Sequence, residues 1–147
     1  MKFSVKGLLE GLAFTDGKLD PALQSLTLSD LRKPDAPLIY VNRGFERMTG
    51  YTPEETIGRN CRFLQGTDTD REAVARIRVN VAAGKPLIID LLNYRKNGTP
   101  FWNRLSLRPV TDDNGVTTHC IGIQSDITRM RSLEDRLYGY AKDLANG

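Results

Sequence analysis

A cysteine stands between two arginines in GRNCRFLQG, residues 58–66, a stretch with a glycine at each end. This residue, Cys61, could act as a nucleophile, but the attacking thiolate requires a base, which is usually histidine. The only histidine of the chain, His119, has the opposite strand parity to Cys120 and Gln124. His119 should therefore face away from the surface that those two residues share. A cysteine–histidine hydrolase is disfavoured, and Cys61 needs another means of activation.

Three amide side chains fall on one face of three consecutive strand patterns. Asn93 and Asn103 continue alternating rows of large apolar residues, and Gln124 continues the row of Cys120 and Gly122. If this face meets the core, the amides are buried and need partners for both donor and acceptor ends. They could satisfy backbone groups at strand ends, or they could bind a flat ligand with imide-like edges, such as a flavin or a pterin. Three amides on neighbouring strands favour the ligand.

Two arginines could hold a phosphate at the same site. Arg78 borders the apolar stripe of a predicted helix, and Arg62 follows Cys61 directly. Guanidinium groups grip phosphate through paired hydrogen bonds. The alternative is a solvated helix face, which is the better interpretation of Arg71 and Arg76.

The elements that position these side chains begin with short strands and helices. Alternating leucines predict a first strand within residues 23–29, and residues 37–41 predict a second. Residues 52–55, TPEE, combine an N-cap, a proline and a capping-box glutamate, and TDRE at 69–72 repeats the capping box. The helix that follows has its apolar residues on one face and should end at Gly84.

Three strands joined by turns fill the second half of the chain. Residues 87–95, 101–110 and 116–127 alternate in polarity, and an Asn-Gly pair lies in each connection. With the first two strands they predict an α+β domain of roughly a hundred residues. Its five-stranded antiparallel sheet would carry a helical insert between the second and third strands.

Helices are predicted at both ends of the chain. Residues 5–13 place apolar side chains at helical spacing, and a C-terminal seam repeats at steps of three and four residues. That seam consists of Met130, Leu133, Leu137, Tyr140 and Leu144. It is short for an independent coiled coil. It could dock on the domain, pair with a second copy, or belong to an ordinary amphipathic helix.

The outward face of the predicted sheet is also apolar, so it requires a second cover. Its apolar residues are Ile88, Leu92, Trp102, Ile121 and Ile123. The terminal helices or the sheet of another subunit could supply the cover. A homodimer through this face and the terminal helices is the leading hypothesis.

The composition is typical of one soluble domain with extensions, with 147 residues, 39% hydrophobic and 27% charged. The net charge of +3 comes from scattered basic residues, which disfavours nucleic-acid binding. No apolar run is long enough to span a membrane, and Glu10 and Asp16 interrupt any signal-peptide core, so a cytoplasmic protein is expected. Neither cysteine has metal-ligand spacing, and both are expected to be free thiols.

The stretch at 58–66 resembles the signature of LOV domains, the flavin-binding, blue-light-sensing branch of the PAS fold. The companions that stand where this family keeps its flavin contacts are Arg78, Asn93, Asn103 and Gln124. The resemblance implies a LOV/PAS core at 24–128. An N-terminal helical extension at 1–23 and a C-terminal helix at 129–147 would flank it.

The resemblance also implies FMN as the cofactor. The pyrimidine edge would meet Asn93, Asn103 and Gln65, and the phosphate would meet Arg62 and Arg78. Further contacts would come from Asn60, Leu64, Val81, Leu105, Leu107, Gly122, Thr27 and Ser29.

The chemistry implied by the resemblance is a reversible cysteinyl–flavin adduct at ring carbon C(4a), formed by Cys61 under blue light. Gln124 would report the adduct, because ring N(5) changes from acceptor to donor when it gains a proton and the amide rotates to follow it. Since the excited flavin activates the thiol, no histidine base is required.

Two positions depart from the family, which often has aromatic residues where Cys120 and Leu105 stand. Cys120 is interpreted as a small core residue, although its inward parity also places a second thiol near the flavin. The sequence thus predicts a free-standing blue-light photoreceptor, without enzymatic activity or a fused effector domain, that signals through the terminal helices of a homodimer or to an unknown effector protein. The alternatives are a flavin-based redox sensor of the PAS fold and an interaction module without a cofactor.

Overall fold

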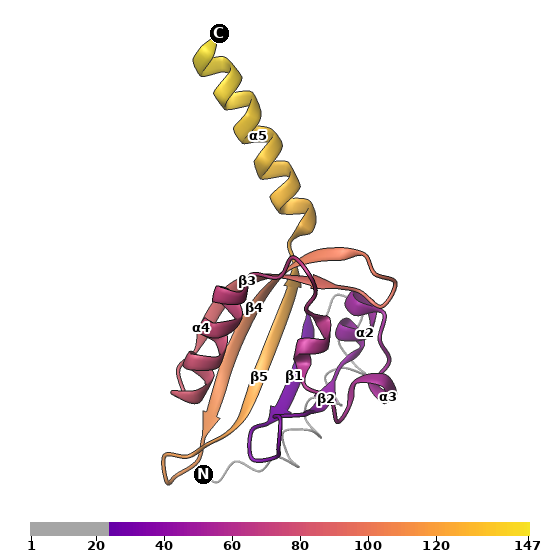
Figure 1. The fold of residues 1–147 in the computed structure, drawn as a ribbon, viewed down its shortest axis with the longest axis vertical. Coiled ribbons are helices and arrows are strands. Elements are labelled where there is room, and N and C mark those ends of the chain that lie inside the picture. The colour runs from indigo at the N-terminus through magenta and orange to yellow at the C-terminus, as the bar shows by residue number, and fades with distance from the viewer. Residues whose placement is uncertain (1–23) are drawn as a thin grey trace.

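The computed structural model describes residues 24–147, which form a five-stranded sheet with its helices (Figure 1). The strands are β1 (Ser25–Asp30), β2 (Leu38–Val41), β3 (Leu87–Tyr94), β4 (Pro100–Thr111) and β5 (Thr117–Asp126). Neighbours pair antiparallel in the order β2-β1-β5-β4-β3. The predicted α+β architecture is confirmed. The helix predicted at 5–13, within the extension 1–23, lies outside the described residues.

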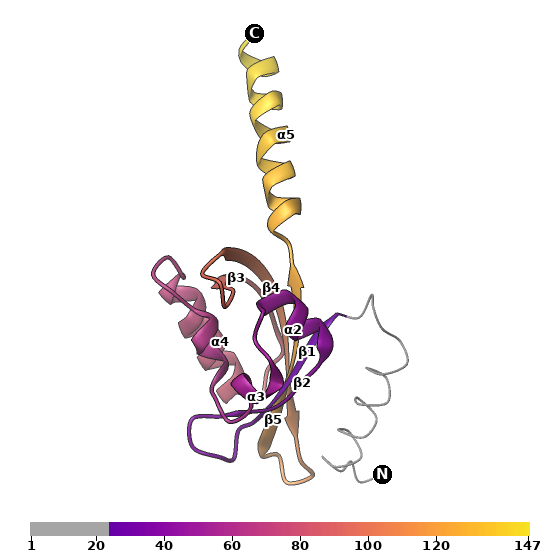
Figure 2. The same cartoon turned by 90° about the vertical axis from the view of Figure 1, so that its right-hand side faces the viewer.

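The helical insert lies between β2 and β3, as predicted. It contains α2 (Arg43–Thr49), α3 (Pro53–Thr56), the 3-10 helix η1 (Cys61–Leu64) and α4 (Arg71–Ala82). Figure 2 shows α3 and α4 on the same side of the sheet. The capping box of α3 is formed: the Thr52 hydroxyl accepts from the Glu55 N–H, and the Glu55 carboxylate accepts from the Thr52 N–H.

The start of α4 differs from the prediction, because Asp70 and not Thr69 is its N-cap. The Asp70 carboxylate accepts from the Glu72 N–H at 2.9 Å. The Thr69 hydroxyl instead donates to the Leu92 carbonyl at 2.7 Å and accepts from the Gly66 N–H at 3.0 Å. The expected capping box is therefore not formed, because the hydroxyl ties the loop before α4 to β3.

Alternation along β3, β4 and β5 directs one row of side chains toward the insert. The buried residues of this row are Ile89, Leu91, Asn93, Phe101, Asn103, Leu105, Leu107, Cys120, Gly122 and Gln124. Several of them pack against Ala73, Val74, Ile77 and Val81 of α4. The predicted inward faces of the three strands, and the burial of their three amides, are confirmed.

The last helix, α5 (Thr128–Asn146), leaves the end of β5 and projects away from the sheet (Figures 1 and 2). None of its residues is buried. Only its beginning is fixed to the sheet: the Trp102 N–H donates to Thr128 Oγ1 at 2.8 Å, and the Arg131 guanidinium lies 3.8 Å from the centre of the Trp102 ring. Most of α5 therefore stands free of the domain.

Candidate functional site

The amides of β3 and β4 form a buried pair. Asn103 donates through Nδ2 to Asn93 Oδ1 at 2.9 Å, and Asn93 Nδ2 donates to the Leu92 carbonyl at 3.2 Å. Asn103 is 1% exposed, and its Oδ1 has no hydrogen-bond partner within the described residues. Because a buried acceptor without a donor is costly, this atom identifies a point at which the hydrogen bonding of the core is incomplete.

The third amide joins β5 to β1. Gln124 lies opposite Ser25 in the antiparallel register. Its Oε1 accepts from the Ser25 hydroxyl at 2.5 Å, and its Nε2 donates to Thr27 Oγ1 at 2.9 Å. Both ends of this amide are thus satisfied by hydroxyl groups, which can themselves donate or accept. A rotation of Gln124 can exchange these roles without leaving a buried polar atom unpaired.

Ser25 is a site residue that the sequence analysis did not assign. The signal was present, since Ser25 shares the strand parity of Thr27 and Ser29. Its importance depends on the pairing of β1 with β5, which the local pattern does not specify.

Gly122 lies between Cys120 and Gln124 on the inward face, and the space for a side chain there is already filled. A Cβ atom at this position would lie 2.4 Å from Thr27 Oγ1 and 2.8 Å from Gln124 Nε2. Both distances are below normal contact, so only glycine fits without displacing the Gln124 network.

Cys61 is the first residue of η1 and is half-buried. Burial raises the pKa of its thiol to about 11, and the proximity of Cys120 contributes to the increase because two thiolate charges would repel each other. Burial likewise raises the pKa of the Cys120 thiol to about 11. The raised pKa values favour the protonated form of both thiols at neutral pH, and the protonated thiol is a weak nucleophile.

The residues on either side of Cys61 hold the loop before β2. The Asn60 carboxamide accepts from the Arg62 N–H at 2.9 Å and donates to the Asp35 carbonyl at 2.7 Å. The exposed Arg62 guanidinium forms an ion pair with the Asp35 carboxylate, which lowers the pKa of that carboxyl group. Asp35 has a positive φ of 66°. Asn60 and Arg62 thus stabilise an unusual turn as well as flanking the thiol.

The remaining residues predicted to contact the ligand differ in how far they are buried. Those that are buried are Thr27, Leu64, Leu105 and Leu107, and those that are half-buried are Ser29, Gln65 and Val81. Gln65 Oε1 accepts from the Arg71 guanidinium at 3.2 Å. Arg78 is exposed on α4. The structure therefore groups the amides, hydroxyls and apolar side chains, whereas the two predicted phosphate ligands, Arg62 and Arg78, lie at the surface.

His119 is not part of this group. It lies opposite Asp30 on β1, with strand parity opposite to Cys120. Its Nε2 is 3.9 Å from the Asp30 carboxylate, and burial lowers the pKa of the ring. The prediction that His119 does not serve Cys61 agrees with this placement.

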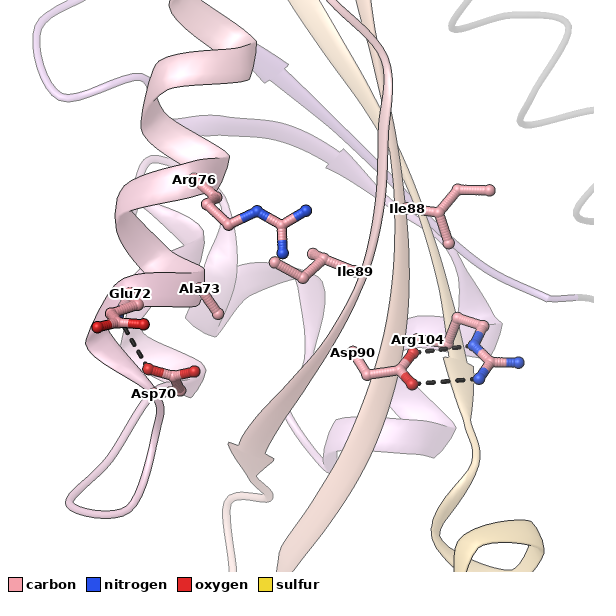
Figure 3. A pocket seen from close by; sticks show the side chains of 8 residues that line it. All are labelled: Asp70, Glu72, Ala73, Arg76, Ile88, Ile89, Asp90 and Arg104. Carbon is pink, nitrogen blue, oxygen red and sulfur yellow. Dashed lines mark hydrogen bonds and ion pairs between the residues drawn. The ribbon is translucent and has the colours of Figure 1, made fainter.

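Two cavities of the described chain lie away from the amides. One, of about 700 Å³, lies between α4 and the β3 edge, where Arg104 forms two hydrogen bonds with Asp90 (Figure 3). The other, of about 570 Å³, lies at the base of α5. Neither is lined by Cys61 or by Asn103, so neither is assigned to the predicted site.

Two other kinds of feature were sought in residues 24–147. No cluster of three or more His, Cys, Asp or Glu side chains there could hold a metal ion. No helix in the same range has the length and hydropathy required to cross a bilayer.

Comparison with known proteins places this arrangement in a family. The family model for the PAS domain matches residues 27–129. Phototropin-2 of Oryza sativa subsp. japonica is 51% identical over 106 residues, which are 72% of this chain and 12% of the phototropin. Blue-light-activated histidine kinase 1 of Erythrobacter litoralis is 48% identical over 104 residues, which are 71% of this chain and 29% of the kinase.

A solved structure extends the likeness to the fold. The LOV domain of the Erythrobacter litoralis EL346 blue-light activated histidine kinase is 42% identical, with a TM-score of 0.70, and the match covers 74% of this chain and 99% of that domain. The chain belongs to the LOV branch of the PAS family. The predicted LOV fold is thereby confirmed. The chain spans only 12% and 29% of the two curated relatives, so this LOV domain corresponds to one part of each.

Proposed function

We propose that this LOV domain is a blue-light receptor that binds FMN. The proposal rests on Asn103, because no group within residues 24–147 donates to its buried Oδ1, while its Nδ2 is bonded to Asn93. An unsatisfied buried acceptor costs about 1–3 kcal/mol, and a ligand with an imide N–H removes that cost. The imide edge of a flavin also offers carbonyl oxygens to amide N–H groups, so its donor and acceptor pattern fits a pair of asparagines.

The residues that would hold FMN fall into groups according to the part of the cofactor that they would contact. Asn93, Asn103 and Gln65 would bind the pyrimidine edge, and Arg62 and Arg78 would bind the phosphate. Arg62 would exchange the Asp35 carboxylate for the phosphate, and Asn60 would continue to hold the turn. The ring would be enclosed by Leu64, Val81, Leu105, Leu107, Gly122, Thr27 and Ser29.

Cys61 would be the reactive group. When bound, FMN supplies a ring carbon, C(4a), that the sulfur can attack after blue-light absorption, and a ring nitrogen, N(5), that takes up the thiol proton. The raised pKa of Cys61 keeps the proton on sulfur until that moment. The same protonation prevents the thiol from acting as a nucleophile in the dark, which favours a sensory role over an enzymatic one.

Gln124 would convert the proton transfer into a structural change. Its amide can rotate because the Ser25 and Thr27 hydroxyls accommodate either orientation. Gln124 lies on β5 two residues before Asp126, which accepts from the Thr128 N–H and hydroxyl at the start of α5. A change at Gln124 would therefore reach α5 through one continuous strand. We further propose that the protein forms a homodimer through α5 and the outer sheet face. Light would alter either this dimer itself or its affinity for a separate effector protein.

The deciding experiment is the visible absorption spectrum of the FMN-loaded protein before and after blue light. We expect the flavin band to bleach and to return in the dark. Cys61→Ala should abolish bleaching and retain bound FMN. Cys120→Ala is the matched control, since Cys120 is the other thiol with a raised pKa, and this variant should still bleach.

The other outcomes of this experiment would indicate a different function or a different reactive thiol. Protein that binds FMN but does not bleach would support a flavin-based redox sensor instead. Protein that remains colourless after added FMN would defeat both flavin functions and leave a PAS interaction module. Bleaching that survives in Cys61→Ala and disappears in Cys120→Ala would move the reactive thiol to β5.

A further inference from the structure

The free part of α5 carries an uncovered apolar seam. Its residues are Met130, Leu133, Leu137, Tyr140 and Leu144, which are 38%, 49%, 69%, 64% and 84% exposed. Their spacing is that of alternating a and d positions in a heptad repeat. The seam begins at the fixed base of the helix and becomes more exposed toward the free end, so the domain itself does not cover it.

Charged residues flank this seam at the positions that select a partner in a coiled coil. Arg129 and Arg136 occupy g positions, and Glu134 occupies an e position. Within residues 24–147, Arg129 and Arg136 form no ion pair or side-chain hydrogen bond, and Glu134 has only a longer-range electrostatic attraction to Arg104. Arg131, by contrast, occupies a b position and faces the domain, where it contacts Trp102 and Asp90.

We propose that α5 pairs with α5 of a second copy in a parallel, in-register arrangement fixed by Arg129 and the partner subunit's Glu134. In a parallel pair each g residue lies beside the e residue five positions later on the partner. Arg129 then meets the partner's Glu134, and the symmetry of the dimer creates this ion pair twice. Arg136 meets the partner's Ala141, which is neutral. This inference rests on the homodimer of the proposed function and assigns its interface.

An antiparallel pair would pack fewer apolar residues of the same seam against the partner. In that arrangement an a position packs against a d position of the partner. The seam has three a residues and two d residues, so an antiparallel pair leaves one of its five apolar residues without a partner layer. A parallel pair matches a with a and d with d, and all five layers are filled.

The cavity of about 570 Å³ at the base of α5 lies beside the seam. Leu133, Arg129 and Arg136 line its α5 side, and Arg95 and Asp126 line its domain side. A second helix packed on Leu133 would enter this space with its own glutamate directed at Arg129. The dimer contact would then lie next to the Arg95–Asp126 ion pair at the junction of β5 and α5.

Charge-reversal variants test the arrangement in the full chain loaded with FMN. Arg129→Glu and Glu134→Arg should each weaken dimerisation by about tenfold in sedimentation velocity, because each places like charges opposite one another twice. An equimolar mixture of the two variants should restore association, since both pairs become complementary in the heterodimer. Arg136→Glu is the matched control and should dimerise as the wild type does.

Other results would overturn the proposal. A monomeric wild type, or single variants that dimerise as tightly as the wild type, would show that α5 is not the interface. Weakening by Arg136→Glu, without rescue in the mixture, would indicate the antiparallel pair in which Arg136 meets the partner's Asp143. Blue-light bleaching of the same samples reports the photoreceptor function separately, so its absence would leave the assignment of the interface intact.

Discussion

Asn103 donates to Asn93 at 2.9 Å, yet only one of the two amides is complete. Asn93 uses its oxygen for Asn103 and its nitrogen for the Leu92 carbonyl, whereas Asn103 Oδ1 is buried with no partner in the described chain. The pair is therefore asymmetric, and its open end is an acceptor. Unpaired buried polar groups are uncommon in folded proteins, and in the proposed function the imide N–H of FMN completes the hydrogen bonding of this one.

Replacing Asn103 with Leu is expected to weaken FMN binding by about tenfold or more, because one hydrogen bond within a buried site is lost. Titration of the apoprotein with FMN, followed by flavin fluorescence, measures the change. Asn114→Ala, in the exposed turn before β5, is the control and should bind FMN normally. Unchanged affinity in Asn103→Leu would exclude this amide from the site.

Adding a methyl group at Gly122 is expected to destabilise the fold by about 1–3 kcal/mol, because the new Cβ lies 2.4 Å from Thr27 Oγ1. Thermal denaturation of Gly122→Ala measures the effect, and adding Thr27→Ala should restore part of the lost stability. Gly139→Ala is the matched control. No atom of residues 24–147 outside its own helix backbone lies within 4 Å of its added Cβ, and alanine is favoured in a helix, so stability should rise slightly.

Arg95 is expected to control the order of the first turns of α5. Its guanidinium donates to Asp126 at 2.6 Å and to the Met48 carbonyl at 2.5 Å, and so links β5 to α2. Arg95→Gln should increase amide hydrogen exchange at the start of α5 while the absorption spectrum of bound FMN stays the same. Arg108→Gln, on the exposed side of β4, should change neither measurement. Equal exchange in the two variants would argue against this link.

Acid stability is expected to depend on Asp30. Hydrogen bonds from Arg32 lower the pKa of this carboxyl group from 3.8 to about 2, although burial acts in the opposite direction. The unfolded chain therefore binds more protons than the folded one in this interval, and stability should fall as the pH drops from about 4 to about 2.

Urea denaturation across that pH range tests the contribution of Asp30. Asp30→Asn should flatten the fall in stability, whereas Asp113→Asn, in an exposed turn, should keep the wild-type dependence. An identical pH dependence in Asp30→Asn and the wild type would remove Asp30 from the acid transition.

Period-two alternation was sufficient to predict the burial of Asn93, Asn103 and Gln124, because strand parity is a local property. Contacts between distant residues were not predictable in this way. Ser25 bonds to Gln124 across 99 positions of sequence, and this contact requires β1 to lie beside β5. Thr69 fits a capping pattern locally, but its hydroxyl bonds to the Leu92 carbonyl, which only the folded sheet brings near.

The contacts of the surface arginines were not predictable from local sequence either. Arg62 was predicted from its neighbour Cys61 as a phosphate ligand, and in the structure it pairs with Asp35, 27 positions earlier. The sequence contains no pattern that links these two residues. Its assignment to the phosphate remains a prediction, as does that of Arg78.

The free length of α5 sets where a response to light should be largest. The helix has 19 residues, which corresponds to about 28 Å, and within residues 24–147 it is fixed to the sheet near Thr128 and Arg131. A tilt of about 10° at that base would displace Asn146 by about 5 Å, roughly one turn of helix. A small reorientation beside the sheet would thus become a measurable displacement of the helix tip, so the interspin distance from a label near the C-terminus to one on the sheet should be more sensitive to light than any probe inside the domain.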